Sequence, residues 1–312
     1  MIEIDNLVKH YGDQKAVNGI SFIVNDDEVL GFLGPNGAGK STTMNIITGY
    51  LSSTSGSVKV NGHDILEEPE LAKEHIGYLP ELPPLYMDMT VLEYLNFVCD
   101  LKKVKKSEHK EQLAKILAMV KIVDVADRLI GNLSKGYKQR VGIAQALVGN
   151  PDILILDEPT VGLDPNQVLE IRKLIRTLAK DHTVIISSHI LSEIQAVCDR
   201  VVIINKGKVA AIDTISDLSK RLSGSSKLLL SFKGDAKKVG NGIRSIPGVI
   251  DFKLRISDKE VHEAEVIVDS STNNDIRTSI FFAMSKLATP ILEFRSLDPT
   301  LEEIFLSITS GK

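Results

Sequence analysis

Residues 34–41 read GPNGAGKS. This stretch follows the apolar segment EVLGFLG and precedes STTMNIITGYL, which has the pattern of a helix. This spacing, between a strand and a helix, is that of a phosphate-binding loop. Glycines let backbone N–H groups turn toward a phosphate, and the start of a helix adds partial positive charge. The sequence therefore predicts a site for a nucleoside triphosphate.

The polar residues of this loop and of a later strand end predict the chemistry. Lys40 would reach the β- and γ-phosphates, and the Ser41 hydroxyl would ligate Mg²⁺. Asp157 and Glu158 follow the apolar run at 153–156, and ligands bind beyond the carboxyl ends of strands in an open parallel sheet. Asp157 is placed to hold Mg²⁺ through water ligands, and Glu158 to orient or deprotonate the attacking water.

The composition favours a globular protein of a reducing compartment. The chain has 312 residues and a net charge of −4, which argues against nonspecific nucleic-acid binding because that needs a basic surface. Cys99 and Cys198 are the only cysteines, so we expect a cytoplasmic protein without a disulfide framework. The first residues do not resemble a secretory signal, and the apolar runs are strand-sized, so we expect any membrane role to be peripheral.

The order of apolar patterns predicts two domains. Through residues 1–222, Val- and Ile-rich runs alternate with helical patterns, which indicates an α/β domain with a mainly parallel sheet and helices on both faces. Residues 89–148 have helical periodicity and are expected to form a helical insert. After a thin linker at 223–226, residues 227–312 read β-α-β-β-α-β and then a helix, which suggests a small ferredoxin-like α+β domain.

A second potential anion site lies at the start of a later helix. Ser134 and Gly136 belong to the segment LSKGY, which precedes a helical pattern. Ser134 suits an N-cap, and a helix start beside a glycine can bind an anion. Most serines at helix starts only cap the helix, so these residues by themselves favour capping.

Taken together, these segments resemble the nucleotide-binding subunits of ATP-binding-cassette (ABC) transporters over residues 1 to about 220. The motifs GPNGAGKS, LSKGYKQR, ILILDEPT and GLDP, followed by His189, occur in the order of that family. The resemblance implies a P-loop cassette that sandwiches two ATP molecules in a homodimer or heterodimer, with each phosphate loop facing the Ser134 segment of the other protomer. It also implies integral membrane permease subunits as partners.

The resemblance assigns further residues. Asp164 belongs to the GLDP loop, which in the family crosses the dimer seam, and His189 matches the histidine that contacts the γ-phosphate. Taken alone, a histidine at a strand end is by default structural. Tyr11 stands where the family stacks an aromatic ring on adenine, although an aromatic residue before Gly-Asp also serves to pack a turn.

The chain departs from the family pattern in two segments. Lys135-Gly136-Tyr137 replaces the usual Gly-Gly-Gln, and this substitution resembles a branch that serves multidrug, antibiotic or polysaccharide exporters. Glu81 stands where the family has a glutamine, in the frame GYLPE. The expected nucleotide-binding residues are Tyr11, Gly34, Pro35, Asn36, Gly37, Ala38, Gly39, Lys40, Ser41, Thr42, Glu81, Ser134, Gly136, Asp157 and Asp164. The expected catalytic residues are Glu158 and His189, and the expected Mg²⁺ site is Ser41, Glu81 and Asp157.

The resemblance thus implies an ATP-hydrolysing subunit, peripheral on the cytoplasmic face of the cell membrane, that drives export through separate permease subunits by ATP-dependent dimer closure. The alternative is a soluble cassette ATPase in assembly, repair or translation without a permease. The basic segment at 101–110 favours a solvated helix end over contact with anionic lipid. Histidines outside the motif series are expected on the surface or in turns: His10, His63, His75, His109, His182 and His262.

Overall fold

The computed structural model describes residues 1–218, 225–257, 261–269, 276–297 and 300–310. The chain forms two compact units, Met1–Thr214 with Ile308–Lys312, and Ile215–Ser307. Part of the linker predicted at 223–226 lies outside the described residues, and its last two residues already begin strand β11 (Ser225–Phe232).

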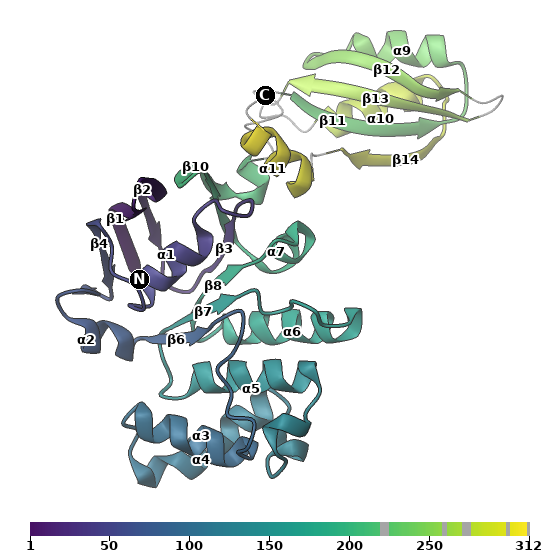
Figure 1. Cartoon of the computed structure of the whole chain (residues 1–312). Helices are drawn as coiled ribbons and strands as arrows, with labels where there is room; N and C mark the ends of the chain where they lie inside the picture. The colour runs from purple at the N-terminus through teal and green to yellow at the C-terminus, as the bar shows by residue number, and fades with distance from the viewer. Residues whose placement is uncertain (219–224, 258–260, 270–275, 298–299, 311–312) are drawn as a thin grey trace. The chain divides into compact units, whose positions relative to one another are not determined.

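A six-stranded sheet forms the centre of the first unit (Figure 1). Its strand order is β10-β9-β3-β8-β7-β6, and every pair is parallel except β10–β9. Strands β3, β7 and β8 are buried along their whole length, as expected of parallel strands covered on both faces. The predicted mainly parallel sheet is confirmed. The strands are β3 (Val29–Leu33), β6 (Ile76–Leu79), β7 (Ile153–Asp157), β8 (Thr183–Ser187), β9 (Arg200–Asn205) and β10 (Lys208–Thr214).

A second, antiparallel sheet of the first unit has the order β2-β1-β4-β5. It shares its core with the central sheet, and the rings of Phe22 and Phe32 lie 5.7 Å apart between them. This antiparallel sheet is not predicted from the sequence. Register shifts in β1, between Ile4 and Leu7 and again near Val8, break the period-two alternation that would reveal the β1–β2 pair. The strands are β1 (Ile2–Tyr11), β2 (Gln14–Val24), β4 (Ser55–Val60) and β5 (His63–Asp64).

Helices surround the central sheet, and three of them form the predicted helical insert. Helix α5 packs against the edge strand β6, and α3 and α4 pack against α5 (Figure 1). Helix α3 begins with a capping box in which Thr90 and Glu93 exchange hydrogen bonds. The helices of the first unit are α1 (Lys40–Ile47), α2 (Pro69–Glu74), α3 (Val91–Leu101), α4 (Lys106–Met119), α5 (Lys135–Leu147), α6 (Pro165–Leu178) and α7 (Leu191–Val197), with 3₁₀ turns at Val123–Val125 and Ile130–Asn132.

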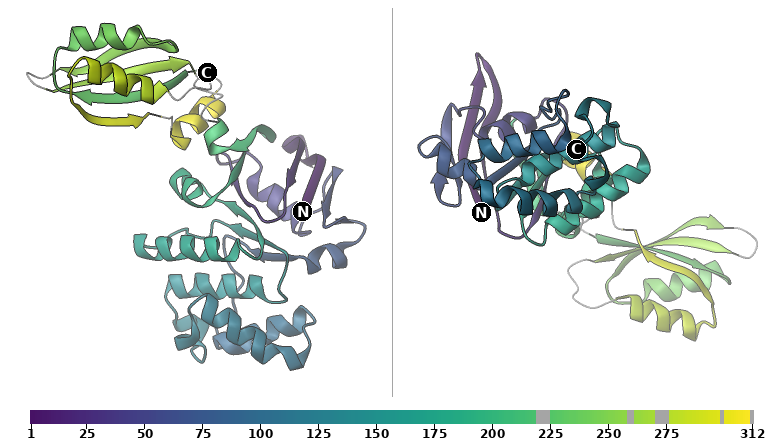
Figure 2. Two further views of the ribbon diagram at one scale, coloured as in Figure 1. Left: turned by 180° about the vertical axis from the view of Figure 1, so that it is seen from behind. Right: turned by 90° about the horizontal axis from the view of Figure 1, so that it is seen from below.

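The second unit has the predicted order β-α-β-β-α-β. Its antiparallel sheet has the strand order β12-β13-β11-β14, and α9 and α10 cover the same face of it (Figures 1 and 2). Phe232, Val239 and Ile280 are fully buried in this core. Assignment to the ferredoxin-like fold stays a prediction. Besides β11, the elements are α9 (Ala236–Arg244), β12 (Val249–Ser257), β13 (His262–Asp269), α10 (Ile276–Lys286) and β14 (Ile291–Ser296), and helix α11 (Leu301–Ser310) follows them.

Within the described part of the chain, none of the helices is both long and apolar enough to span a membrane.

Candidate ATP-binding site

The phosphate loop, residues 34–41, connects the buried strand β3 to α1. Close backbone approach requires a glycine at two of its positions, 34 and 39. A Cβ atom at Gly34 would lie 2.5 Å from the carbonyl oxygen of Ile204, and one at Gly39 would lie 2.5 Å from that of Ala16. Gly39 also has φ 107°, which side chains rarely adopt. The loop is therefore fixed against backbone from β9 and β2, with its N–H groups at the start of a helix.

Lys40 folds back over the phosphate loop. Its ammonium group donates hydrogen bonds to the carbonyl oxygens of Gly34 (2.7 Å) and Pro35 (3.3 Å). Burial lowers the pKa of Lys40, whereas the charges of Glu158 and Asp157 raise it. The structure thus places the predicted phosphate-binding cation near both predicted carboxylates.

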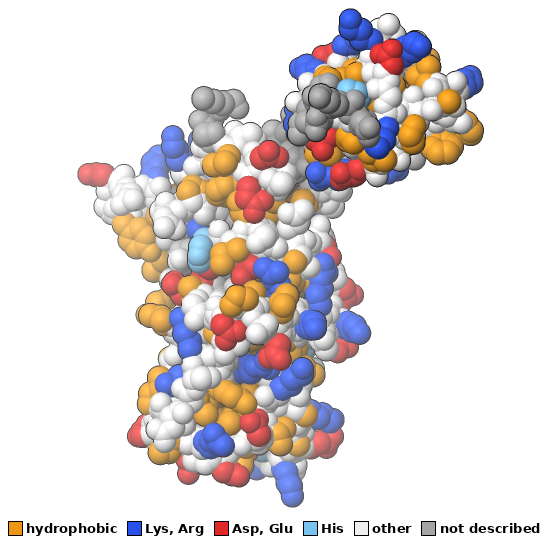
Figure 3. Space-filling model, turned by 90° about the vertical axis from the view of Figure 1, so that its right-hand side faces the viewer, with side chains coloured by type: hydrophobic (Ala, Val, Ile, Leu, Met, Phe, Trp, Pro, Cys, Tyr) orange, Lys and Arg blue, Asp and Glu red, His pale blue; other side chains and the backbone are white. Residues whose placement is uncertain are grey.

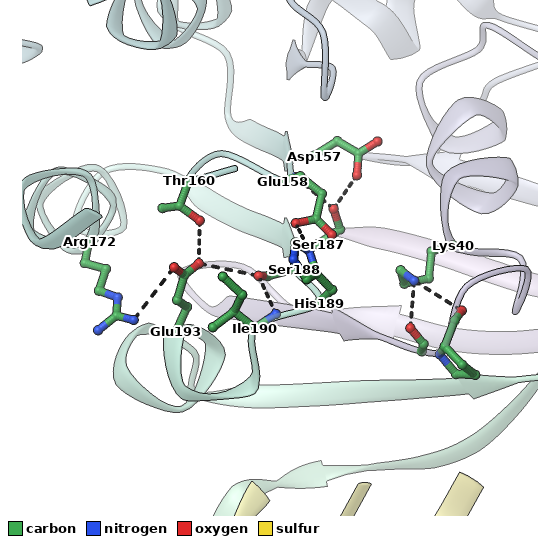
Figure 4. Close-up of polar contacts among 12 residues, drawn as sticks. Lys40, Asp157, Glu158, Thr160, Arg172, Ser187, Ser188, His189, Ile190 and Glu193 are labelled. Atoms are coloured by element: carbon green, nitrogen blue, oxygen red, sulfur yellow. Dashed lines mark hydrogen bonds and ion pairs between the residues drawn. The ribbon is translucent and has the colours of Figure 1, made fainter. Parts of the chain in front are cut away.

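Asp157 and Glu158 stand at the carboxyl end of β7, next to the end of β8. Ser187 donates its hydroxyl to the Asp157 carboxylate, and its Oγ accepts the backbone N–H of Glu158 at 3.0 Å (Figure 4). Glu158 has φ 49°, a left-handed conformation that is strained for a residue with a side chain. Ser187 is not among the residues predicted from the sequence, although it ends the strand β8, whose neighbour β7 carries the carboxylates.

His189 and Glu158 are in direct contact. His189 Nδ1 lies 2.8 Å from Glu158 Oε2, and the Glu158 side chain is 12% exposed. Burial raises the pKa of Glu158, while the hydrogen bond from His189 lowers it. A carboxylate of raised pKa in contact with an imidazole can accept a proton from water. The structure therefore brings both predicted catalytic residues together (Figure 4).

The three predicted Mg²⁺ ligands supply only oxygen atoms. Burial raises the pKa of Asp157, and the charge of Glu81 raises it further, so these two carboxylates lie within electrostatic reach of each other. Ser41 is exposed at the first turn of α1 and offers a hydroxyl. Carboxylate and hydroxyl oxygens are the ligands that Mg²⁺ prefers. The chemistry of this donor set fits the cation.

Tyr11 ends β1 and leaves its ring accessible. The residue is 51% exposed, pairs with Gln14 across the β1–β2 turn, and has Lys9 Nζ 5.6 Å from its ring centroid. The same strand β2 reaches the phosphate loop through the carbonyl oxygen of Ala16 beside Gly39. An exposed aromatic ring on this hairpin is available for stacking.

Ser134, Gly136 and Asp164 have structural partners within the chain. Ser134 caps α5 by accepting the N–H of Tyr137 at 3.4 Å, and Asp164 caps α6. A Cβ atom at Gly136 would lie 2.7 Å from the side chain of Gln167, so α5 and α6 approach closely there. Within one protomer, Ser134 and Asp164 therefore act as helix caps, and Gly136 allows two helices to pack closely. A role of these three residues toward a second protomer stays a prediction.

The basic segment at 101–110 is paired with acids. Lys103 lies 3.3 Å from Glu70, and Lys106 lies 3.8 Å from Asp100. Lys102 points inward and donates to the carbonyl oxygen of Ile76. These partners support the solvated helix end rather than a lipid contact.

The expectation that the remaining histidines lie on the surface or in turns is wrong at His109, which lies in helix α4. His182 lies in the turn between α6 and β8, as expected, although it is buried there. Both are buried, with 8% and 6% exposed. His109 Nε2 lies 3.0 Å from the carbonyl oxygen of Val104, and His182 Nδ1 lies 2.7 Å from that of Pro151. Each ring satisfies its buried nitrogen with a backbone carbonyl, which sequence pattern does not reveal.

A phosphate loop between β3 and α1, carboxylates at the end of β7 and a histidine after β8 define a P-loop ATPase. The protein-family profile described as "ABC transporter" matches residues 17–161. The linearmycin resistance ATP-binding protein LnrL of Bacillus subtilis (strain 168) is 36% identical over 99% of this chain and 98% of its own length. The bacitracin transport ATP-binding protein BcrA of Bacillus licheniformis is 33% identical over 100% and 98%.

Solved structures agree with this assignment. An ATP-binding subunit of an ABC transporter is similar with a TM-score of 0.66 and 30% identity, over 71% of this chain and 93% of that chain. A dimeric bacterial ABC transporter cassette has a TM-score of 0.63 and 26% identity, over 69% and 99%. The chain belongs to the ATP-binding subunits of ABC transporters. It is an ATP hydrolase of that family, as predicted.

Proposed function

We propose that this subunit powers export through separate membrane permease subunits, on whose cytoplasmic face it lies. The main support for this proposal is the similarity to LnrL and BcrA. The match covers 98% of the length of each relative, and it includes the second unit of this chain. Their names give linearmycin resistance and bacitracin transport. The Nod factor export ATP-binding protein I of Burkholderia orbicola (strain AU 1054) is 36% identical over 67% of this chain and 69% of its own length. Export of an antibiotic is therefore the proposed task.

The residues of the site support a hydrolysis cycle. Lys40 and the phosphate loop would bind the β- and γ-phosphates, and Ser41, with Asp157 and Glu81, would hold Mg²⁺, which neutralises phosphate charge. Glu158 would take a proton from the attacking water, and His189 would contact the γ-phosphate while orienting the Glu158 carboxylate. Closure of two protomers around ATP would then be reversed by hydrolysis.

A groove in the first unit supports a permease partner. Its volume is about 600 Å³, and its lining includes Tyr50, Tyr78, Leu82 and Gln145. Tyr50 and Leu82 are each 84% exposed and line the same groove, and exposed apolar side chains gathered in one place are typical of protein–protein contact. Leu82 directly follows Glu81, so an occupant of this groove would touch the segment that carries a predicted Mg²⁺ ligand.

The surface charge favours a protein partner over nucleic acid. On the face drawn in Figure 3, Lys and Arg side chains are interspersed with Asp and Glu, and the whole chain has a net charge of −4. Binding to a phosphate backbone relies on a basic area that neutralises many phosphates.

We assign the second unit to support or regulation of the dimer.

Affinity purification from detergent-solubilised membranes tests the proposal. The tagged chain should recover a membrane protein with several spanning helices. Leu82→Glu should abolish this recovery, because it places a charge in the apolar groove, whereas Leu169→Glu, at a 52% exposed leucine of α6, should not. Recovery of ribosomes or soluble assembly factors, with no membrane protein, would establish the alternative instead.

A further inference from the structure

Glu193 lies in the first turn of α7, with its carboxylate buried between two loops of the site. Its Oε2 atom accepts hydrogen bonds from the Thr160 hydroxyl and from Ser188 Oγ, the latter at 3.4 Å (Figure 4). Ser188 Oγ also accepts the N–H of Ile190 at 3.0 Å. Arg172 of α6 lies 3.9 Å from Oε1. Glu193 is 7% exposed, so these groups must compensate its lost hydration.

These hydrogen bonds join the two segments that carry the catalytic side chains. Thr160 lies two residues after Glu158, and Ser188 directly precedes His189. Glu158 and His189 themselves meet at 2.8 Å. A closed ring of contacts therefore runs from Glu158 through its own loop to Glu193, and back through the histidine segment.

We propose that Glu193 is a positioning residue for ATP hydrolysis, which holds Glu158 and His189 at the spacing where they meet. The inference rests on the proposed roles of those two residues. A carboxylate suits this task because it accepts hydrogen bonds from both loops at once. Displacement of a catalytic group by about 1 Å can cost on the order of 100-fold in rate, so the support is expected to affect turnover.

A purely structural role is the competing explanation, since Glu193 also joins α7 to α6 through Arg172. A second ion pair at the other end of α6 and α7 serves as a control for a purely structural role. Arg176 of α6 lies 3.1 Å from Asp199, which follows α7, and neither residue contacts the catalytic loops in the described part of the chain. Arg176→Met removes the ion pair between Arg176 and Asp199 and leaves the hydrogen bonds of Glu193 in place.

Substitutions separate the two explanations. Glu193→Leu removes both acceptors, and we expect kcat per folded protein to fall roughly 10- to 100-fold while the KM for ATP stays within about twofold. Thr160→Val keeps the shape but removes one donor, and should lower kcat by a smaller factor. Glu193→Gln keeps an acceptor oxygen, so kcat should stay within about threefold of wild type. Arg176→Met should leave kcat unchanged.

Steady-state ATPase assays of the full chain give kcat and the KM for ATP of each variant, and thermal unfolding gives its Tm. Wild-type kcat in both Glu193→Leu and Thr160→Val, with only a lower Tm, would overturn the proposal. Glu158→Gln is assayed in parallel: if it retains turnover, the proposed role of Glu158 fails, which is a separate result.

Discussion

Glu158 combines backbone strain with a buried charge. Its φ of 49° turns the side chain away from the direction of β7, and Ser187 holds this turn by accepting the Glu158 N–H. Left-handed backbone in a residue with a side chain costs on the order of 1 kcal/mol and persists where surrounding contacts fix it. The contact with His189 requires that orientation. Strain and hydrogen bonds together therefore hold the Glu158 carboxylate against His189.

Glu158→Gln and Glu81→Gln should differ in their effects on turnover. The first removes the base, so kcat should fall by ~10²–10⁴-fold. The second leaves an oxygen of the same reach, so kcat should change by less than about tenfold, or ~1.4 kcal/mol, and the Mg²⁺ requirement should rise. ATPase assays across a Mg²⁺ titration compare the two. If Glu81→Gln loses as much ATPase activity as Glu158→Gln, then Glu81 is itself a catalytic base.

The pH dependence of turnover should report the buried carboxylate. Burial raises the pKa of Glu158, so protonation of the base, and loss of kcat, should begin above the ordinary glutamate value of about 4.3. His189→Gln removes the contact that lowers this pKa, and should move the acid limb to higher pH. His182→Gln is the control, because His182 contacts Pro151 instead. An acid limb at the ordinary value would contradict the buried base.

The same raised pKa has a consequence for stability. A carboxyl whose folded pKa lies above its unfolded pKa is destabilised when ionised, so the penalty appears as pH rises from the ordinary value through the raised one. Glu158→Gln should consequently raise Tm at neutral pH more than at a pH below the ordinary glutamate value. Thermal unfolding of both proteins at the two pH values measures this difference.

Among the helices and strands, those with a periodic or a continuously apolar sequence pattern can be predicted from the sequence. The buried strands β3 and β7 and the helical insert at 89–148 are predicted because their patterns are continuous. The β1–β2 pair was missed because register shifts interrupt its alternation. The phosphate loop and its carboxylates follow from motif spacing. Thr160 and Glu193 do not, because single side chains that meet through tertiary packing leave no local pattern.

Gly39→Ala tests how the phosphate loop is built, with Gly62→Ala as a matched control. Both glycines have positive φ, 107° and 87°, so either alanine should cost ~1–2 kcal/mol in the backbone. Only a Cβ at Gly39 meets backbone, at 2.5 Å from Ala16, while the position at Gly62 is open. Gly39→Ala should therefore weaken ATP binding by more than about tenfold, and Gly62→Ala by less than about twofold.

Equilibrium binding of ATP to folded protein, with folding checked by circular dichroism, compares these variants. Equal ATP affinities for Gly39→Ala and Gly62→Ala would show that the contact with β2 does not fix the loop. Equal losses of Tm alone would not decide the point, because the backbone strain is common to both.

At the scale of the whole molecule, all residues of the candidate site belong to Met1–Thr214, within the first unit. That unit also contains Ile308–Lys312, and Asn205 donates a hydrogen bond to the carbonyl oxygen of Thr309 there. A truncation after Leu222 should therefore bind ATP within about threefold of the full chain, because it loses few contacts of the first unit. Full-length Asn205→Ala isolates the loss of that hydrogen bond. A folded truncation that fails to bind ATP would refute the boundary.

Closure of two protomers is the remaining whole-molecule hypothesis, and Ser134 offers a way to test it. Asp and Asn are both good N-caps, so Ser134→Asp and Ser134→Asn should each preserve α5. If Ser134 faces a phosphate of the opposite protomer, the charge of Ser134→Asp should repel it and prevent dimerisation, whereas neutral Ser134→Asn should dimerise measurably. Each change is combined with Glu158→Gln, which should retain ATP, and size-exclusion chromatography in Mg²⁺-free ATP reports the dimer. Because aspartate and asparagine are nearly equal in size, a difference between them isolates charge. Equal dimerisation of both variants would mean that Ser134 only caps its helix, and that the composite site is wrong.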